Sequence, residues 1–159
     1  MKKIKLTICL LLPVIITGCW YYSFTDMPYS NLETVAFIPF ENLTTEYDIA
    51  ENLGLELLSE LENSGLFKIE NKNPDATLYG TITRFERYVN TYTSSDIPEE
   101  YRLTIQAKVT LKDMNKDKIL WERTFEGVGT YKADEDDSQA RIEANSKLIE
   151  NIMQKVREG

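Results

Sequence analysis

The longest regular pattern in the sequence is an alternation of apolar and polar residues over residues 101–112. The odd-numbered residues, beginning with Tyr101 and Leu103, are apolar or aromatic, whereas the even-numbered ones from Arg102 to Lys112 are polar or charged. Because successive side chains of a β-strand point to opposite faces, the pattern predicts a long strand with one buried and one solvated face. The rest of the chain must therefore supply a layer that covers a single face of a sheet.

Other strands are predicted on both sides of this one. Short apolar runs indicate strands over residues 33–40 and 67–70. A longer strand begins at Ala76, and its alternation slips after Ile82, which predicts a β-bulge near residues 83–84. Residues 90–100 are polar and favour a loop, and residues 113–117 favour a turn into a last strand through Trp121 and Phe125.

Two amphipathic helices are predicted from apolar residues that recur every three to four positions. The first begins near Thr45 and ends at residues 64–65, and the second begins after Lys132. Together these elements predict an α+β fold with two amphipathic helices packed on one face of a mainly antiparallel four- to five-stranded sheet, in a single domain over residues 33–159. The predicted buried stripes are Ile49, Leu53, Leu57 and Leu61 in the first helix, and Ile142, Leu148, Ile149, Ile152, Met153 and Val156 in the second.

The first 18 residues have the composition of a secretory signal peptide. Three lysines precede an apolar run over residues 6–16, which is shorter than the about 20 residues that span a bilayer. Residues 16–19 read Ile-Thr-Gly-Cys, and this tetrad resembles the lipobox of bacterial lipoprotein precursors. The resemblance implies removal of residues 1–18, acylation of Cys19, and a tether over residues 19–32. The aromatic residues within 20–24 either lie at the membrane surface, or Tyr21 and Phe24 pack back onto the domain.

Composition excludes several classes of function. The chain contains no histidine, and of its two cysteines one would leave with the signal peptide and the other would carry lipid. No nucleophile–base pair, metal-ligand spacing or phosphate-binding loop is present in the sequence, so we expect neither enzymatic activity nor a cofactor. The mature chain would have 15 basic and 26 acidic residues, or a net charge of −11. This balance argues against a nucleic-acid partner.

Several segments together carry a family resemblance. Residues 34–42 read Thr-Val-Ala-Phe-Ile-Pro-Phe-Glu-Asn, residues 64–67 Ser-Gly-Leu-Phe, residues 75–82 Asp-Ala-Thr-Leu-Tyr-Gly-Thr-Ile, and residues 119–122 Ile-Leu-Trp-Glu. With Cys19 and the leucine-rich helix, this series resembles the LPS-assembly lipoprotein family LptE. The resemblance departs at Trp20, where the family has glycine.

The resemblance implies an outer-membrane lipoprotein on the periplasmic face. Its partners would be the LptD-like β-barrel LPS translocon, which it helps to assemble and plugs, and LPS, which it binds during delivery to the outer leaflet. The family places functional cations before the last helix, where Lys132 lies, and Arg84, Arg87 and Arg102 are further LPS-binding candidates. The alternative is a periplasmic lipoprotein adaptor of another envelope machine, such as a cell-wall synthase activator or a lipid-transporter subunit.

Overall fold

The computed structural model describes Tyr29 and residues 31–159. The predictions for the signal peptide, Cys19 and most of the tether lie outside these residues. Neither described helix has the length and apolar character needed to span a membrane. The described elements are, in chain order, β1 (Thr34–Phe37), β2 (Glu41–Asn42), α2 (Ile49–Ser64), β3 (Lys68–Ile69), β4 (Ala76–Tyr92), β5 (Pro98–Asp113), β6 (Lys118–Lys132) and α3 (Ser138–Glu158).

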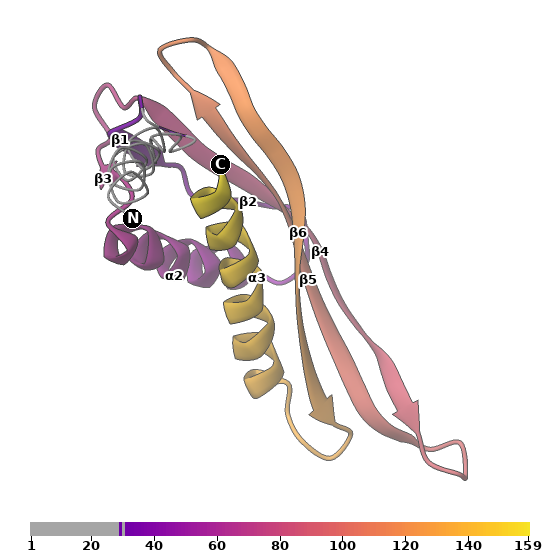
Figure 1. Ribbon diagram of the computed structural model, residues 1–159. Coiled ribbons are helices and arrows are strands. Elements are labelled where there is room, and N and C mark those ends of the chain that lie inside the picture. The colour runs from indigo at the N-terminus through magenta and orange to yellow at the C-terminus, as the bar shows by residue number, and fades with distance from the viewer. Residues whose placement is uncertain (1–28, 30) are drawn as a thin grey trace, which may run out of the picture. The chain divides into compact units, whose positions relative to one another are not determined.

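The strands form one mixed sheet in the order β3-β1-β4-β5-β6, and β2 also pairs with β4. The α+β class with two helices is confirmed, and both helices lie on one face of the sheet (Figure 1). The predicted strand count and pairing are only partly right. β4, β5 and β6 are antiparallel, but β1, β2 and β3 add parallel pairs and bring the sheet to six strands. A parallel pair needs a crossover connection, which α2 provides between β1 and β3.

In the described domain, the three long strands form an extended ribbon that reaches past α2 and α3 (Figure 1). Their register shifts between Ile82 and Arg84, which confirms the predicted bulge. The predicted loop over residues 90–100 is too long, because β4 continues to Tyr92 and β5 starts at Pro98. Backbone pairing between β4 and β5 therefore extends into a polar segment, whose composition alone favours a loop.

Helix α2 buries the predicted leucine stripe but begins later than predicted. Its start is delayed by a turn in which Asn42 accepts hydrogen bonds from Thr44 and donates one to the Glu46 carbonyl oxygen. The helix ends at Gly65, whose φ of 63° is left-handed. Glycine adopts this conformation without steric cost, which explains the stop predicted at residues 64–65.

Helix α3 packs directly on the backbone of β6. A Cβ atom added at Gly127 would lie 1.9 Å from the Ala144 carbonyl oxygen, and one at Gly129 would lie 2.1 Å from that of Ala140. These four small residues therefore pack so closely that no methyl group fits between them. We call Gly127, Gly129, Ala140 and Ala144 the glycine seat. Because Ala140 and Ala144 face the sheet, Ile142 points away and is 60% exposed, so its predicted place in the buried stripe is wrong.

Candidate functional site

The four cations proposed for LPS binding are divided between the two faces of the sheet. Arg84, Arg102 and Lys132 lie on or at the end of the long strands, toward the face that neither described helix covers. Each has a carboxylate neighbour: Arg84 Nε is 3.6 Å from Glu86, Arg102 Nη2 is 3.9 Å from Glu126, and Lys132 Nζ is 3.8 Å from Glu135. These long, partly exposed pairs hold the cations weakly.

Arg102 differs from the other two in its environment. Its guanidinium carbon lies 6.0 Å from the ring centroid of Tyr88, its neighbour across β4. Its Nε is buried and has no hydrogen-bond partner among the described residues. A buried N–H without an acceptor is costly, so Arg102 carries a donor that the described residues leave unsatisfied.

Arg87 lies on the helix-covered face, within an ion cluster that the sequence did not predict. Its Nε donates to Asp137 at 2.6 Å, and its Nη1 lies 3.5 Å from Glu46. Arg141 donates to the same two carboxylates, with distances of 2.7 Å to Glu46 and 3.1 Å to Asp137. We call Glu46, Arg87, Asp137 and Arg141 the arginine cluster. It joins the turn before α2, strand β4 and the first turn of α3.

The arginine cluster is built over one aromatic ring. The guanidinium carbons of Arg87 and Arg141 each lie 4.8 Å from the centroid of Phe85, which is a favourable distance for a cation–π contact. Burial raises the pKa of Asp137, but hydrogen bonds from both arginines outweigh it and leave that pKa below its usual value. Burial lowers the pKa of Arg141, and its bonds to Glu46 and Asp137 reverse the effect and raise it. Asp137 and Arg141 are therefore both ionised at neutral pH.

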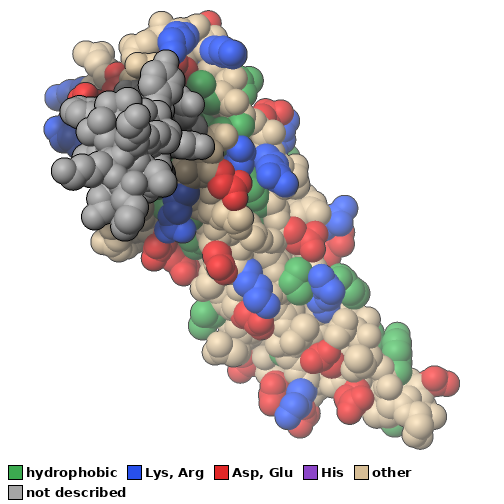
Figure 2. Space-filling view, in the orientation of Figure 1, with side chains coloured by type: hydrophobic (Ala, Val, Ile, Leu, Met, Phe, Trp, Pro, Cys, Tyr) green, Lys and Arg blue, Asp and Glu red, His purple; other side chains and the backbone are tan. Residues whose placement is uncertain are grey.

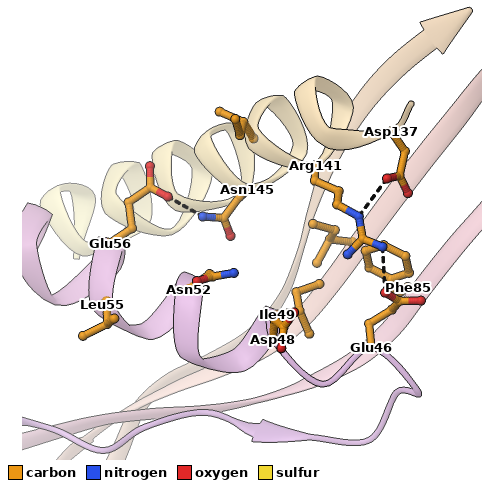
Figure 3. Close-up of a pocket in the computed structure, with 12 residues that line it drawn as sticks. Glu46, Asp48, Ile49, Asn52, Leu55, Glu56, Phe85, Asp137, Arg141 and Asn145 are labelled. Atoms are coloured by element: carbon orange, nitrogen blue, oxygen red, sulfur yellow. Dashed lines mark hydrogen bonds and ion pairs between the residues drawn. The ribbon is translucent and has the colours of Figure 1, made fainter. Parts of the chain in front are cut away.

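An open cleft of about 700 Å³ lies beside the arginine cluster, between α2 and α3. Its floor is apolar and consists of Ile49, Phe85 and Ile105, and its rim carries the exposed side chains of Leu55 and Ile142. Figure 3 shows Glu46, Asp137 and Arg141 of the arginine cluster at one end and the Asn145–Glu56 hydrogen bond at the other. The volume lies within the range of about 300–1,000 Å³ that is usual for ligand sites.

The glycine seat explains why this cleft exists. The residue pairs Phe85–Ile105 and Ile105–Gly127 place these three residues in one row across the sheet. Helix α3 can approach the sheet only at the glycine end of this row, because only there is side-chain volume missing. The Phe85 end is thus left to α2 and its preceding turn, and the space between the two helices stays open.

Sequence reasoning missed Glu46, Arg141 and the cleft. Glu46 and Arg141 are 95 positions apart, and neither belongs to a local motif. Their pairing depends on where α3 crosses the sheet, which no sequence spacing reveals. The candidates predicted from the sequence were single cations, chosen from the family resemblance. A site formed between two helices has no sequence pattern that could have revealed it.

Among the described residues, no group of three or more histidine, cysteine, aspartate or glutamate side chains could hold a metal ion. Acidic and basic side chains are interspersed over the visible face of the described part (Figure 2). Mixed charge of this kind produces no strong field of one sign over this face.

Several solved structures share the fold. CT253, a hypothetical protein from Chlamydia trachomatis, aligns with a TM-score of 0.64 and 8% identity over 79% of this chain and 96% of its own. The PelC dodecamer subunit from Paraburkholderia phytofirmans aligns with a TM-score of 0.52 and 18% identity over 76% and 86%. Lipoprotein GNA1162 from Neisseria meningitidis gives 0.50 and 13% over 80% and 99%. At these identities the likeness shows the fold alone.

Comparison at the level of sequence families is more specific. No curated protein sequence matches this chain. The family model LptE, described as lipopolysaccharide-assembly, matches residues 32–157, which is nearly all of the described domain and most of the chain. The resemblance read from short segments is therefore confirmed, and the chain belongs to the LptE lipopolysaccharide-assembly family.

Proposed function

We propose that this protein is a lipoprotein of the outer membrane, anchored at Cys19, that assembles with and plugs a β-barrel LPS translocon. The single observation that carries this proposal is the family match over residues 32–157. The precursor-like N-terminus, with its lipobox-like tetrad, supports the anchor and an envelope location. Two or more acyl chains on one cysteine would make that attachment stable.

We further propose that the uncovered face of the long strands binds LPS during its delivery. Arg102 is the leading residue because its Nε lacks an acceptor and its pair with Glu126 is long. Arg84 and Lys132 add cations toward the same face, and guanidinium and ammonium groups bind phosphates through charge-assisted hydrogen bonds. Arg87 is left out of this set, because it lies on the helix-covered face and pairs there with Asp137 and Glu46.

Binding to LPS tests the second part of the proposal. The full chain in detergent, with Arg102→Gln, should bind LPS about tenfold more weakly than wild type, since one charge-assisted contact is lost. Lys118→Gln is the matched control, because Lys118 is exposed at the opposite end of β6 and forms no ion pair with a described residue. Equal affinity of Arg102→Gln and wild type would contradict the assignment of this face.

Co-purification tests the first part. A large outer-membrane β-barrel should co-purify with the protein in detergent, and depletion of the protein should leave that barrel misassembled. Co-purification with a peptidoglycan synthase in place of a barrel would instead favour the adaptor role. Replacement of Cys19 by alanine should release the protein from the membrane fraction, and unchanged membrane retention would contradict lipid anchoring.

A further inference from the structure

The cleft between α2 and α3 contains a polar atom that nothing in the described chain satisfies. Asn145 is 9% exposed, and its Oδ1 is buried with no hydrogen-bond donor. Its amide nitrogen donates to Glu56, and because an ionised carboxylate only accepts, the amide must be oriented in this way. The Asn145 oxygen therefore points away from Glu56, into the space between the helices (Figure 3). A donor from an occupant of the cleft, or from a bound water, would satisfy this oxygen.

The cleft also has an unbalanced negative charge. The two arginines of the arginine cluster neutralise Glu46 and Asp137. Asp48 and Glu56 line the same cleft and form no ion pair with any described residue. Asp48 is the N-cap of α2 and Glu56 follows eight residues later, with Asn52 between them, so the two residues lie on one side of the helix about 12 Å apart. The rim thus offers two carboxylates to cations and would repel phosphates.

The apolar part of the cleft is built for a large side chain. Phe85, Ile105 and Ile49 form its floor, and Leu55 and Ile142 remain 63% and 60% exposed at its mouth. The row of Phe85, Ile105 and Gly127 that creates the cleft belongs to the sheet, so the cavity is preformed. Exposed apolar residues around a preformed concave site, with few polar groups placed inside it, are typical of a binding site.

We propose that this cleft binds a segment of a partner protein that presents a large apolar side chain between two basic ones. The apolar side chain would lie on Phe85 and Ile105, and a backbone N–H of the segment would donate to Asn145 Oδ1. The two basic side chains would pair with Asp48 and Glu56. A protein segment fits better than a lipid because it carries both a backbone donor and cations at this spacing. The inference does not depend on LPS binding or on the barrel partner.

A peptide with the proposed chemistry provides the direct test. The probe is the acetylated, amidated peptide Lys-Ala-Trp-Ala-Lys, titrated into the full chain in detergent and followed by NMR of backbone amides. We expect shift changes at residues 52, 142 and 145, and much smaller ones with Glu-Ala-Trp-Ala-Glu. Absence of shifts at these residues up to about millimolar peptide (a binding free energy near −4 kcal/mol), or equal shifts with both peptides, would overturn the proposal.

Two charge variants distinguish binding in the cleft from non-specific attraction of a basic peptide to an acidic protein. Asp48→Asn with Glu56→Gln should weaken binding of the basic peptide about tenfold, because two partly exposed ion pairs are lost. Glu60→Gln with Glu62→Gln removes the same charge from exposed positions of α2 outside the cleft and should change binding less than about twofold. Thermal unfolding of both variants establishes that each is folded. An equal loss of peptide affinity in the two variants would contradict the proposal.

A photoreactive residue in place of Ile142 identifies the natural occupant in cells. We expect the cross-linked fragment, sequenced by mass spectrometry, to contain an apolar residue flanked by lysine or arginine, and the cross-link to fade with Asp48→Asn and Glu56→Gln. The same photoreactive residue in place of Ile119, which is 49% exposed on β6 and outside the cleft, is the control. Cross-links to lipid alone, to an acidic segment, or to nothing would overturn the proposal.

Discussion

The two halves of the long strands are held in different ways. We call the half near Asp75 the closed half, where the starts of β1 and β4 and the turn after β5 meet. Asp75 accepts hydrogen bonds from the backbone N–H groups of Glu33 and Thr34 and from the side chains of Thr34 and Asn115. We call the half near Gly127 and Gly129 the open half. There α3 lies on these two glycines, and the arginine cluster links α3 to β4. One half is fixed by neutral donors around a carboxylate, the other by close packing and ion pairs.

This difference separates a structural node from a candidate site. The Asp75 carboxylate is surrounded by donors of its own chain and leaves no atom for an external group. The open half keeps the cleft, with Asp48 and Glu56, which form no ion pair with a described residue, and the unsatisfied oxygen of Asn145. Polar groups that are fully satisfied stabilise a fold, whereas groups that are satisfied only in part point to a binding partner or bound water.

The largest expected effect comes from closing the glycine seat. Gly127→Val should lower the free energy of unfolding by about 3 kcal/mol or more, because its Cβ would meet the Ala144 backbone and α3 must lift from the sheet. Urea unfolding followed by circular dichroism measures the change.

A glycine in the other helix provides the matched control. A Cβ atom at Gly54 would lie 3.8 Å from the ring of Phe37, which is an ordinary contact. Gly54→Ala should therefore raise the free energy of unfolding by about 0.5–1 kcal/mol through higher helix propensity. If Gly127→Val were as stable as wild type, the seat would not determine the position of α3.

The sequence predicted elements with a local periodicity better than the contacts between elements. The alternation over residues 101–112 and the leucine stripe of α2 depend on local periodicity, so both were recognisable. The parallel pairing of β1 and β3 was not, because short apolar runs have the same pattern in either direction. The lateral position of α3 depends on missing volume at Gly127 and Gly129, and a small residue in a strand leaves no periodic signal.

The candidate site shows the same limit. The predicted cations are on the molecule where strand alternation places them, since Arg102 is an even-numbered residue of β5 and faces away from Leu103. The bulge reverses which residues of β4 face the helices, and this change places Arg87 on the helix-covered face. After the register shift at residues 82–84, odd-numbered residues of β4 face the helices, so Arg87 enters the arginine cluster with Glu46.

A smaller effect is expected from opening the arginine cluster. Arg141→Met should lower the free energy of unfolding by about 1 kcal/mol, a value that allows for its 35% exposed side chain and solvent screening. The deficit should shrink as salt rises from about 0.05 M to about 1 M, because screening weakens the pairs in wild type.

An ion pair on the solvent side of α3 is the control for that variant. Lys147→Met removes a pair with Glu143 at 2.6 Å, where both side chains are largely exposed, and should cost about 0.3–0.5 kcal/mol or less. Equal costs for the two variants would show that the arginine cluster is no more than a surface feature.

The last expected effect is a change in stability at acidic pH, and it concerns Asp75 in the closed half. Hydrogen bonds from Asn115 and Thr34, with the backbone N–H groups of Thr34 and Glu33, lower the pKa of Asp75 from 3.8 to about 2. A carboxyl whose pKa is lower in the folded state stabilises the fold above its unfolded pKa, and this contribution is lost as pH falls through the folded value. Asp75→Asn should therefore be less stable than wild type at neutral pH, and the gap should shrink between pH 3.8 and about 2. Thermal unfolding of both proteins across this range measures it. Because these donors are neutral, the gap should hardly respond to salt, in contrast to that of Arg141→Met, and a strong salt response would contradict the distinction between the two halves.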